Sequence, residues 1–210
     1  MLRIIKPGGI MKGMSGFRFE LSRQLVHLSG ILFIIFAQFI GREATILYFA
    51  VIAVFFFLYS WYIRNREKRV QNMLSRMESK FRDLTLKFER KDANPFAGAM
   101  FFYIGCTVAF AVFPFNIASA AGAMLAVGDS LSTLVGTRLG RHKIGRTGKS
   151  FEGSLACFAG SLVAGVFFVA PHIAVLGAIA ATAAELMPKI NDNLSIPVIS
   201  GLIMFLSSLI

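Results

Sequence analysis

The sequence has few charged residues, few acids and only two cysteines. Charged residues make up 16% of the 210-residue chain, against about 25% in soluble globular domains. Cys106 and Cys157 lie inside apolar runs and have neither zinc-ligand spacing nor a paired framework, so we predict small buried hydrophobic side chains. A disordered chain and a disulfide scaffold are therefore both excluded.

Apolar residues and positive charge are abundant instead. Hydrophobic residues are 56% of the chain, and 22 Lys+Arg against 11 Asp+Glu give a net charge of +11. The mean hydropathy is +0.67. A soluble nucleic-acid binder would explain the charge, but one core of this size cannot bury so much apolar surface. The composition favours a membrane protein with segregated basic residues and without a nucleic-acid partner.

Seven apolar runs are long enough, or nearly long enough, to cross a bilayer, which takes about 20 residues. They are residues 24–41, 44–63, 96–113, 117–136, 154–170, 172–187 and 196–210. Pro114, Pro171 and Pro188 separate several of them, because proline breaks a helix. The runs predict an all-α, polytopic membrane helix bundle of about seven transmembrane helices, forming a single integral membrane domain over residues 1–210.

The basic residues predict the orientation of these spans. With the N-terminus in the cytoplasm, the inside segments are 1–23, 64–92, 137–149 and 188–194, and they hold 21 of the 22 Lys+Arg. Arg42 is then the one basic residue outside. The positive-inside rule therefore predicts a cytoplasmic N-terminus and an outside C-terminus.

The inside segment 64–92 has its own helical pattern. Apolar residues recur at alternating spacings of four and three between Val70 and Phe88, which is typical of an amphipathic helix. We expect an interfacial helical insert lying on the headgroups. A homodimer contact through a short coiled coil is the alternative, since the spacing also fits heptads.

Ionisable and polar residues gather at the cytoplasmic ends of the predicted spans. They are Glu20, Arg23, His27, Asp129, Lys149, Glu152, Glu185, Asp192 and Asn193. Such groups are costly inside a membrane and are functional candidates by default. Their convergence on one face predicts a site there.

The residue types at this site indicate its chemistry. Five carboxylates without a thiolate cluster suit a hard divalent cation such as Mg²⁺. The basic loop 138–149, RLGRHKIGRTGK, has five Lys+Arg, three glycines and no acid, which favours phosphate binding. GRTGKS at 145–150 is not a P-loop, because position 143 is Lys where that motif needs Gly. A metal, phosphates and a membrane-embedded site together suggest nucleotide-dependent chemistry on a lipid.

Four stretches carry a resemblance to a known family. They are ELSRQLVHLSG at 20–30, GDSLSTLVGTRLG at 128–140, GKSFEGSLACF at 148–158, and the stretch from Glu185 through DNLSIP, which ends at Pro197. In their order and spacing the chain resembles the polyprenol kinase family of integral membrane proteins, which includes dolichol kinase, phytol kinase and CTP-dependent diacylglycerol kinase. The resemblance implies transfer of a phosphoryl group from CTP to a lipid alcohol at the cytoplasmic face, with a divalent cation.

The resemblance and the residue chemistry together give the expected roles. Catalytic roles are expected for Asp129, Lys149 and Glu152. Metal binding is expected for Asp129, Glu152, Glu185 and Asp192. Nucleotide and phosphate binding is expected for Arg138, Arg141, Lys143, Arg146, Gly148, Lys149, Ser150 and Asn193. Supporting positions are Glu20, Arg23, His27 and Gly128.

Two other functions fit parts of the sequence. A membrane cytidylyltransferase would use CTP and the same residue types, but would act on a lipid phosphate and release pyrophosphate. A small transporter would need polar residues along a path across the bilayer, whereas the outer halves of the predicted spans are almost purely apolar. The lipid, the choice of CTP over ATP and the oligomeric state are not readable from the residues.

Overall fold

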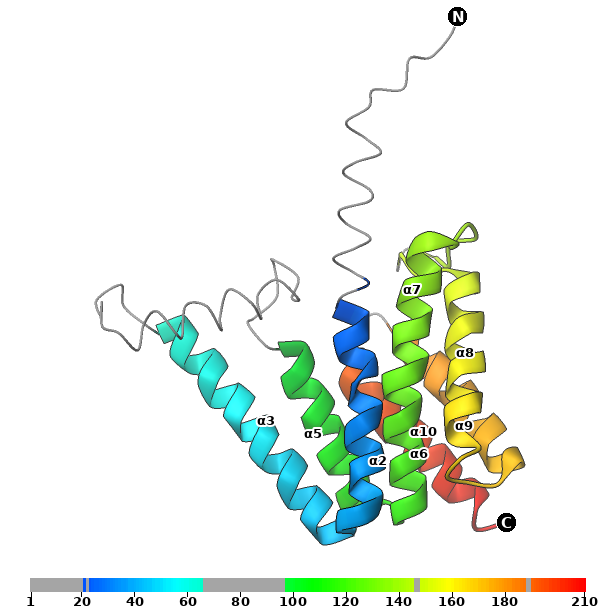
Figure 1. The fold of residues 1–210 in the computed structure, drawn as a ribbon. Helices are drawn as coiled ribbons and strands as arrows, with labels where there is room; N and C mark the ends of the chain where they lie inside the picture. The colour runs from blue at the N-terminus through cyan, green and yellow to red at the C-terminus, as the bar shows by residue number, and fades with distance from the viewer. Residues whose placement is uncertain (1–20, 22, 66–96, 146–147, 188–189) are drawn as a thin grey trace, which may run out of the picture.

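The computed structural model describes residues 21, 23–65, 97–145, 148–187 and 190–210, which form helices and no strand. Figure 1 shows their arrangement. The elements are α2 (Gly30–Ile40), α3 (Arg42–Asn65), α5 (Ala97–Val112), α6 (Phe115–Met124), the π-helical turn η1 (Leu125–Asp129), α7 (Ser130–Arg138), α8 (Phe151–Gly165), α9 (Pro171–Glu185) and α10 (Asp192–Ser207). Of the predicted amphipathic insert, residues 66–92 lie outside the described residues.

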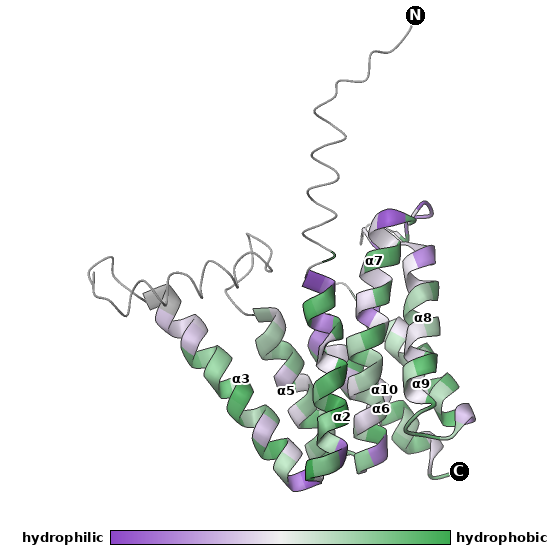
Figure 2. Cartoon of the chain, viewed as in Figure 1, coloured by the Kyte–Doolittle hydropathy of each residue, from purple (hydrophilic) through white to green (hydrophobic). Residues whose placement is uncertain are grey.

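Three helices are long and apolar enough to cross a membrane. They cover Arg23–Ile40, Arg42–Tyr62 and Phe115–Arg138. Four shorter apolar helices, α5, α8, α9 and α10, accompany them. Hydrophilic residues concentrate near the helix ends, and hydrophobic residues occupy the middle of the helices (Figure 2). The all-helical class is confirmed, and these lengths are compatible with a membrane protein.

The helix ends fall on two opposite sides of the molecule (Figure 1). One side holds the start of α2, the end of α3, the start of α5, the end of α7 and the start of α8. The α2–α3 turn at Gly41 is on the other side, where φ is +80°, a conformation that favours glycine. From this turn α3 leans away from α2, so their far ends are well separated.

Polar side chains fasten the helices near this turn. Arg42 donates from Nε to the Phe110 carbonyl and from Nη2 to the Ala111 carbonyl, both at 2.9 Å. Gln38 Nε2 donates to Ser119 Oγ at 2.9 Å. Since these bonds join α3 to α5 and α2 to α6, the helices are held together at the end remote from Asp129 and Lys149 (Figure 1).

The central helix runs without a break from Phe115 to Arg138 through the turn η1. Small residues let its neighbours approach closely: a side chain at Gly122 would come within 2.6 Å of Ile34 Cδ1. Close packing over small residues is typical of membrane helices. A π-helical turn inside an α-helix frequently marks a functional site, and Asp129 is the last residue of this one.

The last helix begins one turn before the seventh apolar run. Asp192 and Asn193 were expected at the start of the seventh span, and α10 begins at Asp192, ahead of the run at 196–210, and contains Pro197. Pro197 is the sixth residue of α10 and has no backbone N–H to donate to the Asn193 carbonyl four residues earlier. The extra turn is capped, since Asn191 Oδ1 accepts from the backbone N–H of Asn193 at 3.0 Å. This brings Asp192 and Asn193 onto a rigid element.

Candidate functional site

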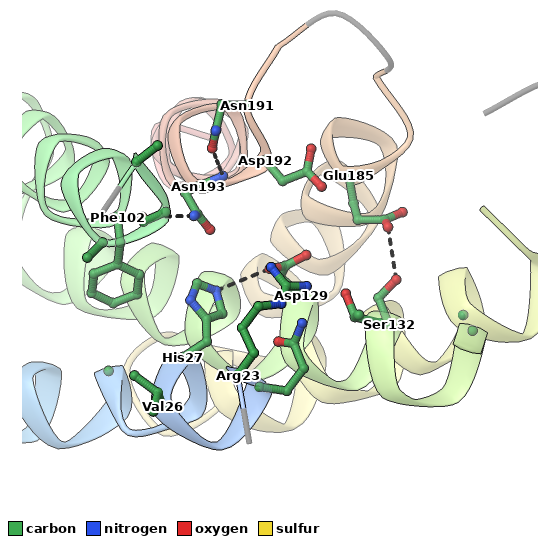
Figure 3. A pocket seen from close by; sticks show the side chains of 18 of the residues that line it. Arg23, Val26, His27, Phe102, Asp129, Ser132, Glu185, Asn191, Asp192 and Asn193 are labelled. Atoms are coloured by element: carbon green, nitrogen blue, oxygen red, sulfur yellow. Dashed lines mark hydrogen bonds and ion pairs between the residues drawn. The ribbon is translucent and has the colours of Figure 1, made fainter. Parts of the chain in front are cut away.

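A cavity of about 970 Å³ lies among the helix ends on the side that holds the end of α7 and the start of α8 (Figure 1). Its lining comes from residues 23–33, α3, α5, η1, α7, the loop before α8, the first turn of α8, the end of α9 and the start of α10. Figure 3 shows that these side chains converge from elements far apart in the sequence. The cavity is therefore assembled by the tertiary fold.

Three carboxylates meet in this cavity. Asp129 ends η1, Glu185 ends α9 and Asp192 begins α10. One oxygen from each lies within 4.8 Å of the other two. Oxygen ligands in such a group suit Mg²⁺ or another hard cation.

Lys149 supplies a positive charge to this cluster. Its Nζ lies 2.8 Å from Glu185 Oε1 and 2.9 Å from Asp192 Oδ2, and it also donates to the Glu185 backbone carbonyl. Burial disfavours the charged form of Lys149, but the hydrogen bonds to Glu185 and Asp192 outweigh it, so the pKa of Lys149 is raised. The side chain remains an ammonium ion at neutral pH.

Glu185 is the most buried acid of the cluster, at 4% exposure. Its Oε1 accepts from Ser132 Oγ at 2.9 Å, in addition to the Lys149 contact. Its Oε2 is buried and has no hydrogen-bond partner among the described residues. A buried carboxylate oxygen without a partner is costly. Glu185 Oε2 is therefore an oxygen that could serve as a ligand to a cation.

A histidine orients the third acid. His27 Nε2 lies 3.2 Å from Asp129 Oδ2, and both side chains are largely buried. The opposite side of the imidazole meets the Phe102 ring edge-on, with centroids 5.4 Å apart. The His27 imidazole therefore lies between the Phe102 ring and the Asp129 carboxylate.

The loop before α8 folds as a short hairpin. Ile144 N–H donates to the Lys149 carbonyl, and Phe151 N–H donates to the His142 carbonyl, both at 2.9 Å. Gly145 and Gly148 turn the chain with φ of +54° and +76°. Ser150 Oγ then caps α8 by accepting from Gly153 N–H. The hairpin thus projects Lys149 toward the acids.

Glu152 lies in the first turn of α8, next to the base of this hairpin, and lies apart from the three acids. Its Oε1 lies 2.7 Å from His142 Nδ1, and both of its oxygens accept from the His142 backbone N–H at 3.3 Å. It does not line the cavity. In the structure its carboxylate holds the base of the hairpin, and it lies outside the group formed by Asp129, Glu185 and Asp192.

Glu152→Gln is expected to loosen the hairpin. The amide keeps the shape of the side chain but loses the charge that binds the His142 ring and backbone. Hydrogen exchange at the Ile144 and Phe151 amides should accelerate by about two- to fivefold, since exposed ion pairs contribute only modestly to local stability. Mass-spectrometric exchange measures this, and Glu43→Gln serves as the control. Unchanged exchange at both amides would contradict the positioning role.

The other predicted site residues divide into three groups. Arg23, Lys143, Gly148, Ser150 and Asn193 line the cavity. Arg138 and Arg141 are exposed and lie outside the lining. Glu20 and Arg146 lie outside the described residues.

Gly128 has a packing role in the structure. A side chain there would collide with Ser161 Oγ and come within 3.3 Å of the Cys157 carbonyl. The glycine lets α8 approach η1, next to Asp129. Its effect on the site is therefore indirect.

Sequence reasoning missed Ser132 and Phe102. Ser132 lies three residues after Asp129, and a spacing of three places residues on one helix face. That spacing could have indicated a partner for the acids. Phe102 gave no signal of its own, because it is one of 22 phenylalanines.

The fold and the cavity define a class of protein: a helical chain with membrane-compatible helices and a charged, buried site at one set of helix ends. The chain is 31% identical over 191 residues to "Uncharacterized protein RP860" of Rickettsia prowazekii (strain Madrid E). The aligned region covers 86% of this chain and 91% of that protein. This chain belongs to the same family as that protein. No protein-family model matches the chain, and no solved structure matches it.

Proposed function

We propose that this protein is a lipid kinase that transfers the γ-phosphoryl group of CTP to the hydroxyl of a membrane lipid alcohol, as its resemblance to the polyprenol kinase family implies. One observation carries the proposal. A single cavity holds Asp129, Glu185, Asp192 and Lys149 at one end, and its wall continues into apolar and aromatic residues. Such a cavity suits a charged nucleotide and an apolar acceptor at the same time.

The residues take roles that follow from their places. Phosphates approach from the hairpin, where Lys149, Lys143 and the N-terminus of α8 supply positive charge. Asp129 accepts the proton of the lipid hydroxyl, with His27 holding the carboxylate in place. The bond between the lipid oxygen and the γ-phosphorus forms, the bond from that phosphorus to the β–γ bridging oxygen breaks, and CDP leaves.

A divalent cation completes the proposed site. Asp129, Glu185 and Asp192 would hold it, and the unpartnered Glu185 Oε2 is the atom that fits this role. Mg²⁺ bound there would neutralise phosphate charge. Asn193 Nδ2 donates to the Gly98 carbonyl at 3.0 Å, so the buried Oδ1 of Asn193 is left as an acceptor for the nucleotide.

An activity screen tests the proposal. Purified protein in nanodiscs is incubated with γ-labelled CTP or ATP, or with α-labelled CTP, together with Mg²⁺ and isoprenoid alcohols, diacylglycerol or the phosphate esters of these lipids. We expect a phosphorylated lipid and CDP as products. A CDP-lipid with pyrophosphate would instead identify a cytidylyltransferase, and no lipid product with any nucleotide would overturn both activities.

We also propose seven membrane spans, with the N-terminus and the site on the cytoplasmic side. From α2 to α8, successive helices run in opposite directions when α6, η1 and α7 are taken as one helix (Figure 1), and 21 of 22 Lys+Arg fall in the segments assigned to the inside. A cluster of basic residues on that side also favours contact with anionic headgroups.

Cysteine labelling tests the orientation. Arg141→Cys lies in the basic hairpin and His172→Cys lies near the start of α9, and both parent side chains are exposed. A membrane-impermeant maleimide should label Arg141→Cys in inside-out vesicles and His172→Cys in right-side-out vesicles. The native cysteines are buried and serve as the background. Labelling of both variants from one side would contradict the topology.

A further inference from the structure

One wall of the cavity is apolar and contains no charged side chain. We name it the apolar arm and define it by Val26, Gly30, Phe33, Phe56, Phe102 and Tyr103. These residues come from residues 23–33, α3 and α5. The arm therefore lies between helices that are separated in the sequence.

The aromatic rings of the arm form one continuous surface. Tyr103 contacts three of them: Phe56 is stacked on it at 5.9 Å between centroids, Phe33 meets it edge-on at 5.8 Å, and Phe102 meets it edge-on at 5.3 Å. Gly30 is also required, because a Cβ atom there would come within 2.5 Å of the Phe102 ring. This surface offers hydrocarbon contact along its length.

The arm reaches the apolar outer surface of the molecule. Val26 lines the cavity and is 56% exposed, and its neighbour Leu25 is 55% exposed. α2 and α3 diverge from the Gly41 turn toward this end (Figure 1). In a bilayer, exposed apolar side chains at this position face lipid, so the arm opens sideways.

The inner end of the arm is polar. Phe102 contacts the His27 ring, and His27 contacts Asp129 at 3.2 Å, as Figure 3 shows. A carboxylate accepts a hydrogen bond from a hydroxyl group. It repels a phosphodiester headgroup, which has no proton to donate. The junction therefore suits an alcohol better than a phospholipid.

We propose that the apolar arm binds the hydrocarbon chain of a lipid alcohol, which enters sideways from the bilayer between α2 and α3 and places its hydroxyl beside His27 and Asp129. The inference rests on the proposed function, to which it adds the location and the entry route of the acceptor. The nucleotide occupies the hairpin side of the same cavity, so the two substrates meet at Asp129.

Photolabelling tests the inference without relying on turnover. The full chain in nanodiscs is irradiated with a long-chain primary alcohol that carries a diazirine in mid-chain, and labelled residues are mapped by mass spectrometry. Labels should concentrate on the residues of the apolar arm, and excess unlabelled alcohol should displace them. Phe56→Trp should reduce labelling by about fivefold or more, whereas Phe57→Trp should not, because Phe57 is exposed outside the cavity. Val26→Trp narrows the opening from the helix Arg23–Ile40. It replaces Phe56→Trp in this experiment if that variant does not fold.

Three results would overturn the inference: even labelling of all exposed helices, equal labelling by a diazirine phospholipid, or no effect of the tryptophan variants. Failure of the proposed function gives a different result. Displaceable labelling of the arm without phosphoryl transfer from any nucleotide would keep the lipid site and remove the kinase. Phosphoryl transfer without labelling of the arm would keep the kinase and remove the lipid site in the arm.

Discussion

Asp129→Asn is expected to reduce phosphoryl transfer by roughly 10³-fold, the upper range for removal of one preorganised electrostatic group. The change removes both the proton acceptor and a negative charge from the site. It keeps the volume of the side chain and an oxygen that can face His27, so the fold should be retained. Steady-state transfer from γ-labelled CTP to the lipid alcohol measures the loss, and thermal unfolding checks the fold.

Glu43→Gln is the matched control for this prediction. Glu43 is exposed in the first turn of α3, near the Gly41 turn and remote from the cavity. The same loss of one carboxylate should leave turnover unchanged there. If Asp129→Asn stays folded and retains a tenth or more of the wild-type rate, Asp129 does not act as the proton acceptor.

The sequence was sufficient to predict the helical class and the meeting of the principal charged residues. Asp129, Lys149, Glu185 and Asp192 each stand at or near the end of an apolar run, and they share one side if the runs alternate in direction. Topology alone therefore predicts their proximity. The cavity that contains all four agrees with that reasoning.

The partners of individual side chains could not be predicted in this way. Glu152 lies three residues from Lys149 in the sequence, yet its carboxylate binds His142. The pairing depends on the hairpin, in which Lys143 lies opposite Ser150. A loop rich in glycine and basic residues leaves this register open, so spacing could not distinguish a metal ligand from a residue that positions the loop.

The aromatic wall was unpredictable for a different reason. Phe33, Phe56 and Tyr103 belong to runs that are apolar on all sides, where no residue stands out. Whether such a ring faces lipid, the core or a cavity depends on the angles between helices. The divergence of α3 from α2 determines this, and no local pattern in either run indicates it.

Lys149→Gln is expected to change metal affinity and turnover in opposite directions. Its Nζ lies within 2.9 Å of both Glu185 and Asp192, where a divalent cation would also bind. Two unit charges about 4 Å apart interact by about 4 kcal/mol at a dielectric constant near 20. Removing the ammonium should therefore raise Mn²⁺ affinity without nucleotide by about tenfold or more. Turnover should fall by roughly 10²-fold, because the phosphates lose a positive charge.

Electron paramagnetic resonance of free Mn²⁺ measures this affinity in the purified protein. Lys149→Arg keeps the charge and should show no gain in Mn²⁺ affinity. Lys143→Gln is the matched control, because it removes a cavity-lining cation whose Nζ donates to the Gly148 carbonyl and not to the acids. Glu185→Gln should lose Mn²⁺ binding, whereas Glu152→Gln should bind as the wild type does. A parallel fall of affinity and turnover in Lys149→Gln would mean that the lysine supports the acids structurally and does not compete with a cation. Retained binding in Glu185→Gln would place the cation elsewhere.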